Sequence, residues 1–211
     1  MSTATYTPAA IAAQVPKGRA IVSAGAAADG ASRSGVWVAI FAITMSFAAF
    51  TSALFVREGS SSDWVHLTLP NIIYANTLVI LLSSFTFAMA SRAVRSRTYM
   101  EAQAVNTVMA WLAATFALGL LFIAGQYAAW RQLAAQGLYL ATNPNSSFFY
   151  VFTGAHVLHV LGGVAALVYL IGQLAGSHTT FRRGAFSNIA IYWHFMAVLW
   201  LYLLFVLRTR I

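Results

Sequence analysis

Residues 35–56 read GVWVAIFAITMSFAAFTSALFV, a run that contains no charged side chain. An α-helix rises about 1.5 Å per residue, so a run of this length crosses a bilayer hydrocarbon core of roughly 30 Å. Four further apolar runs follow along the chain. The sequence therefore predicts an all-α membrane protein, a polytopic bundle with five transmembrane helices at about 35–56, 69–90, 104–130, 148–175 and 189–207.

The composition of the whole chain fits a lipid environment. Of the 211 residues, 60% are hydrophobic and 8% are charged, whereas soluble domains carry about 25% charged residues. The predicted helices use most of the chain, which leaves no room for a separate soluble domain. The sequence contains no cysteine, and this excludes disulfides, thiolate zinc sites, iron–sulfur clusters and cysteine nucleophiles.

Basic residues indicate how the predicted helices are oriented. Residues 1–34 are rich in Ala, Ser and Gly and lack the apolar core of a signal peptide, so we expect a flexible cytoplasmic tail before a transmembrane domain at 35–211. Cytoplasmic loops carry the excess of Lys and Arg. Eight basic residues fall on one side and four on the other, which predicts a cytoplasmic N-terminus and an external C-terminus. The two groups are Lys17, Arg19, Arg33, Arg92, Arg95, Arg97, Arg182 and Arg183, against Arg57, Arg131, Arg208 and Arg210. Because these charges flank apolar runs instead of forming one stripe, we expect no nucleic-acid partner.

The acidic residues all fall outside the predicted helices. They are Asp29, Glu58, Asp63 and Glu101. A carboxylate proton relay or a di-iron site requires Asp or Glu inside the bundle. The sequence therefore argues against a pump core and, less strongly, against a cation-coupled transporter, since backbone carbonyls can also bind Na⁺.

Three histidines fall inside predicted helices. His156 and His159 share a face of the fourth helix, and His194 lies on the fifth. At 1.5 Å per residue, His159 is about 16 Å from the outer end and His194 about 8 Å from the inner end, and these depths do not coincide in a core of about 30 Å. This disfavours a haem held by two imidazoles. Two histidines on one face could hold a lone metal, but no carboxylate or sulfur ligand accompanies them. We therefore predict no catalytic, cofactor or metal residue, and expect these histidines to hydrogen-bond inside the protein or to contact lipid.

Neutral polar residues mark a second set of candidates for structural or lipid contacts. Asn76 with Ser83, and Thr77 with Ser84, repeat at a spacing of seven on the second helix, which favours hydrogen bonds between helices. Gln126 on the third helix needs partners if it is buried.

Arg92 and Arg95, on the predicted inner side, would suit anionic lipid headgroups.

Four motifs in order resemble subunit III of the cytochrome c oxidase family, including its relatives in quinol oxidases. The resemblance covers about residues 35–207, and the chain is similar to the five-helix form of the family. The motifs are LP…NT…SS at 69–84, LG…F…Q at 118–126, TGAHVLHV at 153–160 and YWHF…W at 192–200. His156, His159, His194 and Trp193 belong to the last two and are expected to have structural or lipid-contact roles.

The resemblance implies an accessory subunit of a haem-copper terminal oxidase, which reduces oxygen to water with proton translocation by the complex. Such a subunit binds no haem or copper, packs beside catalytic subunit I and subunit II, binds phospholipids and protects the active complex. Haem and copper would lie in the partner subunits, a respiratory supercomplex is a further candidate partner, and the expected location is a bacterial cytoplasmic membrane.

The sequence departs from the family pattern at three places that often carry acids. Residues 40–46 contain no acid, Ala128 and Ala129 follow Gln126, and Ala197 follows the YWHF motif. This chain lacks the acids to which a proton-uptake role in the family would be tied. Other interpretations left open are an accessory subunit of a quinol oxidase or nitric oxide reductase, a small membrane transporter, and a haem-binding membrane anchor.

Overall fold

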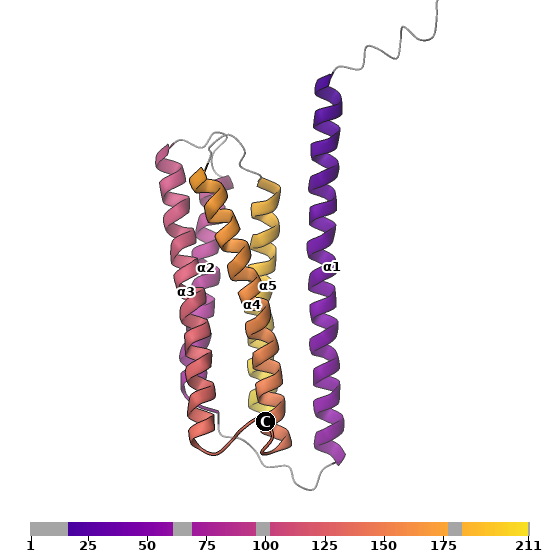
Figure 1. Ribbon diagram of the computed structural model, residues 1–211, viewed down its shortest axis with the longest axis vertical. Helices are drawn as coiled ribbons and strands as arrows, with labels where there is room; N and C mark the ends of the chain where they lie inside the picture. The colour runs from indigo at the N-terminus through magenta and orange to yellow at the C-terminus, as the bar shows by residue number, and fades with distance from the viewer. Residues whose placement is uncertain (1–16, 61–68, 96–101, 177–182, 211) are drawn as a thin grey trace, which may run out of the picture.

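The structure is a computed structural model that describes residues 17–60, 69–95, 102–176 and 183–210. These described residues form five helices and no strand. Figure 1 shows the helices side by side, with consecutive helices running in opposite directions. Each helix contains a segment long and apolar enough to cross a membrane. The predicted all-α bundle of five membrane-spanning helices is thus confirmed, with bounds α1 Lys17–Ser60, α2 Ile72–Arg95, α3 Ala102–Ala135, α4 Pro144–Gly176 and α5 Arg183–Arg210.

The first helix begins earlier than predicted. α1 starts at Lys17, so residues 17–34, which were expected to belong to a flexible tail, continue the helix. This segment is rich in Ala, the residue with the highest helix propensity, which explains why the helix extends past its apolar part. The apolar part, Arg33–Ser60, includes the predicted span at 35–56. Residues 1–16, together with Asp63, Arg97, Glu101 and Arg182, lie outside the described residues.

The turn between α3 and α4 shows how the sequence sets these helix ends. Gly137 has a φ of 78°, and its N–H donates to the carbonyl of Ala134 at 3.0 Å, while the N–H of Leu138 donates to Leu133 at 3.1 Å. This bonding pattern closes a helix around a left-handed glycine. Pro144 then opens α4, where the N–H that proline lacks would have no partner in the helix.

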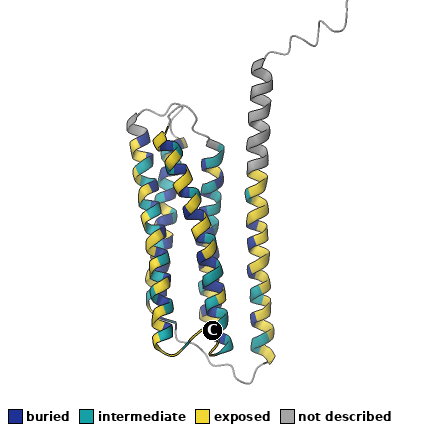
Figure 2. Ribbon diagram, viewed as in Figure 1, coloured by how far each residue is buried: buried dark blue, intermediate teal, exposed yellow. Residues whose placement is uncertain are grey.

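Helices α2 to α5 pack around a common core, and α1 lies at its side. α1 contacts α5 and, less extensively, α4. Figure 2 shows that most of the described part of α1 is exposed, with buried positions along one edge. Those buried positions are Ile40, Ile43, Phe47 and Leu54.

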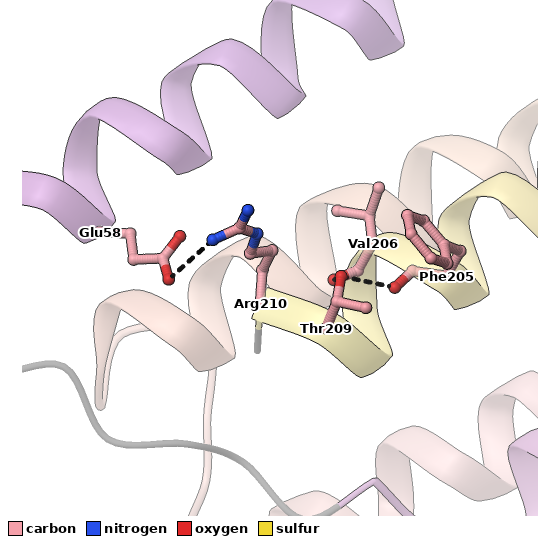
Figure 3. A network of polar contacts seen from close by, with 5 residues as sticks. All are labelled: Glu58, Phe205, Val206, Thr209 and Arg210. Carbon is pink, nitrogen blue, oxygen red and sulfur yellow. Dashed lines mark hydrogen bonds and ion pairs between the residues drawn. The ribbon is translucent and has the colours of Figure 1, made fainter.

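An ion pair, a cation–π contact and a hydrogen bond join α1 to α5 near the C-terminal ends of the two helices. The guanidinium of Arg210 lies 3.7 Å from the carboxylate of Glu58 and 4.6 Å from the ring centroid of Phe55. Figure 3 shows Arg210 reaching from α5 toward Glu58 on α1. Two turns further into the bundle, the hydroxyls of Thr51 and Tyr202 lie 2.8 Å apart. The C-terminal ends of α1 and α5 therefore lie at the same side of the bundle, as alternation of five spans requires.

Candidate functional site

The indoles of α5 hydrogen-bond the hydroxyls of α2. The Nε1 of Trp193 donates to Ser83 Oγ at 3.0 Å, and the Nε1 of Trp200 donates to Thr77 Oγ1 at 3.0 Å. Both indoles are fully buried. The two indoles are seven residues apart on α5, so they lie on the same face. The predicted polar stripe of α2 therefore faces α5 at these two hydroxyls.

The same stripe also reaches α3. The amide nitrogen of Asn76 donates to the carbonyl of Phe122 at 3.0 Å. Nearer the C-terminal end of α2, Ser83 Oγ donates to the carbonyl of Thr115 at 3.3 Å. The hydroxyl of Thr115 lies 2.8 Å from that of Thr86. The polar side chains of α2 thus form hydrogen bonds with both α3 and α5.

The three helical histidines lie in different surroundings. His156 is fully buried, with ring centroids 5.7 Å from Phe122 and 5.2 Å from Trp200. His159 is half-buried, donates from Nδ1 to the carbonyl of Ala155 at 2.6 Å, and lies against a phenylalanine of α1. His156 therefore faces α3 and α5, whereas His159 faces α1.

The third histidine is joined to α2. His194 is half-buried, and its Nδ1 lies 2.6 Å from Ser84 Oγ. Its ring meets that of Phe87 edge-on, with a centroid distance of 6.1 Å. Across the described part of the chain, no three or more His, Cys, Asp or Glu side chains lie together in a way that could hold a metal ion. The expectation that this chain holds no metal or cofactor stays a prediction.

Gln126 is a candidate whose surroundings the sequence did not predict. Its side chain is fully buried, and neither its oxygen nor its nitrogen has a hydrogen-bond partner among the described residues. One turn later on the same helix, Trp130 Nε1 donates to Thr153 Oγ1 of α4 at 2.9 Å. The amide therefore lies within the buried contact between α3 and α4.

The two arginine candidates lie at the C-terminal end of α2, and both are exposed. Arg95, with Ser91 and Ser187, lines a cavity of about 210 Å³ between α2 and α5. Larger cavities with mostly apolar walls border α1. One of about 380 Å³ lies among α1, α4 and α5 beside Gly162 and Tyr192, and one of about 330 Å³ lies between α1 and α5 beside Phe47.

Sequence reasoning missed the hydrogen-bonding role of the indoles. It placed Trp193 in a motif and treated the hydroxyls of α2 as a stripe without assigning their partners. The signal was present in the spacing, because Trp193 and Trp200 repeat at seven residues while Ser83 and Thr77 repeat at six on the antiparallel helix. The arrangement as a whole joins helices to one another.

Comparison with known proteins assigns the family. The model of the family described as cytochrome c oxidase subunit III matches residues 33–209. "Probable cytochrome c oxidase subunit 3" of Mycobacterium tuberculosis is 33% identical over 126 residues, 59% of each chain. "Cytochrome c oxidase subunit 3" of Thermostichus vulcanus is 28% identical over 177 residues, 80% of this chain and 82% of that protein.

A third relative has a longer chain. "Heme-copper oxidase subunit I+III" of Aeropyrum pernix is 27% identical over 179 residues, 80% of this chain and 21% of that protein. The match to the mycobacterial relative spans 59% of its length, whereas the family model covers all five membrane-spanning segments. This chain belongs to the cytochrome c oxidase subunit III family.

Proposed function

We propose that this chain is the accessory third subunit of a haem-copper terminal oxidase, a complex that reduces oxygen to water and translocates protons. The match of the subunit III family model across residues 33–209 carries this proposal. The site geometry supports a non-catalytic role, because Asn76, Trp193 and Trp200 hydrogen-bond neighbouring helices and His159 bonds the backbone of its own helix. Haem and copper would lie in partner subunits.

The partner that the proposal names first is catalytic subunit I. The Aeropyrum pernix relative supports this choice, since its name joins subunits I and III in one protein. A covalent fusion is workable where two units lie next to each other in the complex. Subunit II and a respiratory supercomplex are further proposed partners, and the proposed location is a bacterial cytoplasmic membrane.

The proposed role within the complex is to stabilise the catalytic subunit and to bind phospholipid. The apolar cavities of about 380 and 330 Å³ beside α1 are open to the side of the bundle and suit acyl chains. The cavity at Arg95 offers a cation and two hydroxyls at the proposed inner side, where the leaflet is anionic. The exposed Arg92 one turn away adds a second positive charge for a headgroup.

The test is to purify the complex through an N-terminal tag on this chain in mild detergent, which leaves the Glu58–Arg210 pair at the other end intact. We expect haem absorbance to co-purify with oxygen uptake from reduced cytochrome c. A matched preparation from cells with the same tag on an unrelated five-helix protein should be colourless. A colourless, solitary chain would contradict the proposal.

The accessory role has its own readout. Complex prepared without this chain should begin turnover at a comparable rate but lose oxygen uptake faster during continued turnover. Equal lifetimes with and without the chain would contradict a protective role while leaving the family assignment in place.

A further inference from the structure

Two fully buried polar side chains of the bundle, Gln126 and His156, have no hydrogen-bond partner among the described residues. Both amide atoms of Gln126 and both ring nitrogens of His156 are buried, and none has a hydrogen-bond partner within the described residues. Such groups lose their water on burial, and buried polar groups in proteins are nearly always paired. Each of these two side chains therefore requires a partner that the described residues do not supply.

The contacts around them place Gln126 and His156 at the same level. Phe122, one turn before Gln126 on α3, meets the ring of His156 at 5.7 Å. Trp130, one turn after Gln126, donates to Thr153 on the α4 turn that precedes His156. On α3, Gln126 therefore lies between Phe122 and Trp130, which contact His156 and Thr153 on adjacent turns of α4.

The direction of the helices brings the two side chains together. In an α-helix the Cα–Cβ bond leans toward the N-terminus. α3 and α4 run in opposite directions. From this geometry we expect Gln126 to lean toward the level of Phe122, where His156 lies, and His156 to lean toward the level of Thr153. Helix geometry thus directs the amide and the imidazole toward each other.

We propose that Gln126 and His156 form an internal polar site that binds water, with one molecule bridging the amide and the imidazole. A neutral imidazole has one donor and one acceptor nitrogen, and an amide has both kinds of atom. Buried water usually makes about three hydrogen bonds, so these two side chains supply suitable groups on both sides. The rings of Phe122 and Trp200 against His156 close the site to lipid chains.

Water fits this site better than a metal ion. The described residues bring no third His, Cys, Asp or Glu side chain to these two. A primary amide and a neutral imidazole provide no negative charge for a cation. The site concerns the interior of this chain and does not rest on the proposed oxidase function, which is tested by haem absorbance and oxygen uptake.

A double-mutant cycle tests whether the two side chains share a partner. We expect Gln126→Leu and His156→Phe each to lower the melting temperature of the purified protein. Each substitution removes one of the two side chains that hold the water, so the remaining buried polar side chain loses its partner. The double variant should lose clearly less than the sum of the two single variants, since it removes both polar groups. Additive losses would overturn the proposal.

A matched cycle controls for general damage to the core. His194→Phe removes the histidine of α5 that bonds Ser84 of α2. This pair lies about three helical turns along the bundle from the level of Gln126 on α3. Combined with Gln126→Leu, it should give additive losses, because distant sites do not share partners.

A high-resolution cryo-EM map of the wild-type protein identifies the partner directly and does not depend on variants that fold. We expect a density peak at about 2.7–3.2 Å from a polar atom of each side chain. The same peak should be absent from a map of the Gln126→Leu protein. A map in which the amide and the imidazole bond each other, with no density between them, would overturn the proposal.

Discussion

Trp193 shows at the scale of one residue how packing and hydrogen bonding depend on each other in this bundle. Lipid chains are as apolar as leucine, so helices in a membrane associate through close packing and hydrogen bonds. The indole donates to Ser83 and also lies against the backbone of two glycines, Gly119 on α3 and Gly163 on α4. The absence of side chains at these glycines is what lets the ring reach its acceptor.

This close approach predicts a strong effect from a single methyl group. A Cβ at Gly119 would lie 2.9 Å from the ring of Trp193, and the ring is held in place by its hydrogen bond. We expect Gly119→Ala to destabilise the protein by about 1–3 kcal/mol, the range for overpacked cores. The measurement is the midpoint of thermal unfolding in detergent.

Gly172→Ala is the matched control for this variant. A Cβ at Gly172 meets nothing within 4 Å, so the change should be neutral or stabilise the helix by roughly 0.5–1 kcal/mol. Equal midpoints for the Gly119 and Gly172 variants would show that the indole can move aside.

The hydrogen bond of Trp200 allows a second prediction. Trp200→Phe retains an aromatic ring against Phe122 but removes the donor to Thr77. Hydrogen bonds between membrane helices average about 0.6 kcal/mol, and the smaller ring also leaves a cavity at this fully buried position. We therefore expect Trp200→Phe to cost more stability than Thr77→Val, which removes only the acceptor. Unfolding midpoints of both single variants and the double variant should show coupling. Additive losses would mean that the bond contributes nothing.

Sequence reasoning found the polar face of α2 but not its partners, and the reason lies at the residue scale. A spacing of seven fixes the direction in which Thr77 and Ser84 point relative to each other. It carries no information about which helix stands opposite. The partner depends on tertiary packing, which here places α5 beside Thr77 and α3 beside Asn76.

At the scale of the element, hydropathy located the spans but not the helix ends. The predicted third span ended at residue 130, whereas α3 continues to Ala135. Hydropathy marks where lipid ends, and the residues that follow, Arg131 to Ala135, are good helix formers. The end is set by Gly137 and its bonds to the last turn.

That mechanism predicts the effect of a side chain at Gly137. Its φ of 78° is the left-handed region, which costs L-residues about 1–2 kcal/mol. We therefore expect Gly137→Ala to destabilise the protein by about 1 kcal/mol, measured by thermal unfolding. Gly59→Ala serves as control, because that glycine has neither a positive φ nor an atom within 4 Å of a built Cβ. A neutral Gly137→Ala would indicate that the turn adopts another conformation at little cost.

At the scale of the whole molecule, the number of spans was predictable, but the position of α1 at the side of the bundle was not. In water, an apolar face marks the side of a helix that packs. In lipid, both faces are apolar, so exposed Phe41 and buried Phe47 of α1 look alike in the sequence. For the same reason the sequence could name His156 and His159 as neighbours on one helix without showing that they face different helices.

The orientation of the whole bundle is a prediction from charge alone, and the cysteine-free sequence makes it directly testable. The chain between α3 and α4 should lie outside the cell, and the end of α4 should lie inside, because the inner side carries the excess of basic residues. Ala141 and Gly176 mark these two places, and both are exposed. In intact spheroplasts, a membrane-impermeant maleimide should label an Ala141→Cys variant, and should label a Gly176→Cys variant only after the membrane is opened. The unmodified chain, which has no thiol, is the background control. The reverse labelling pattern would show that the N-terminus is external, and would move Arg92 and Arg95 away from the anionic leaflet on which their proposed lipid contacts depend.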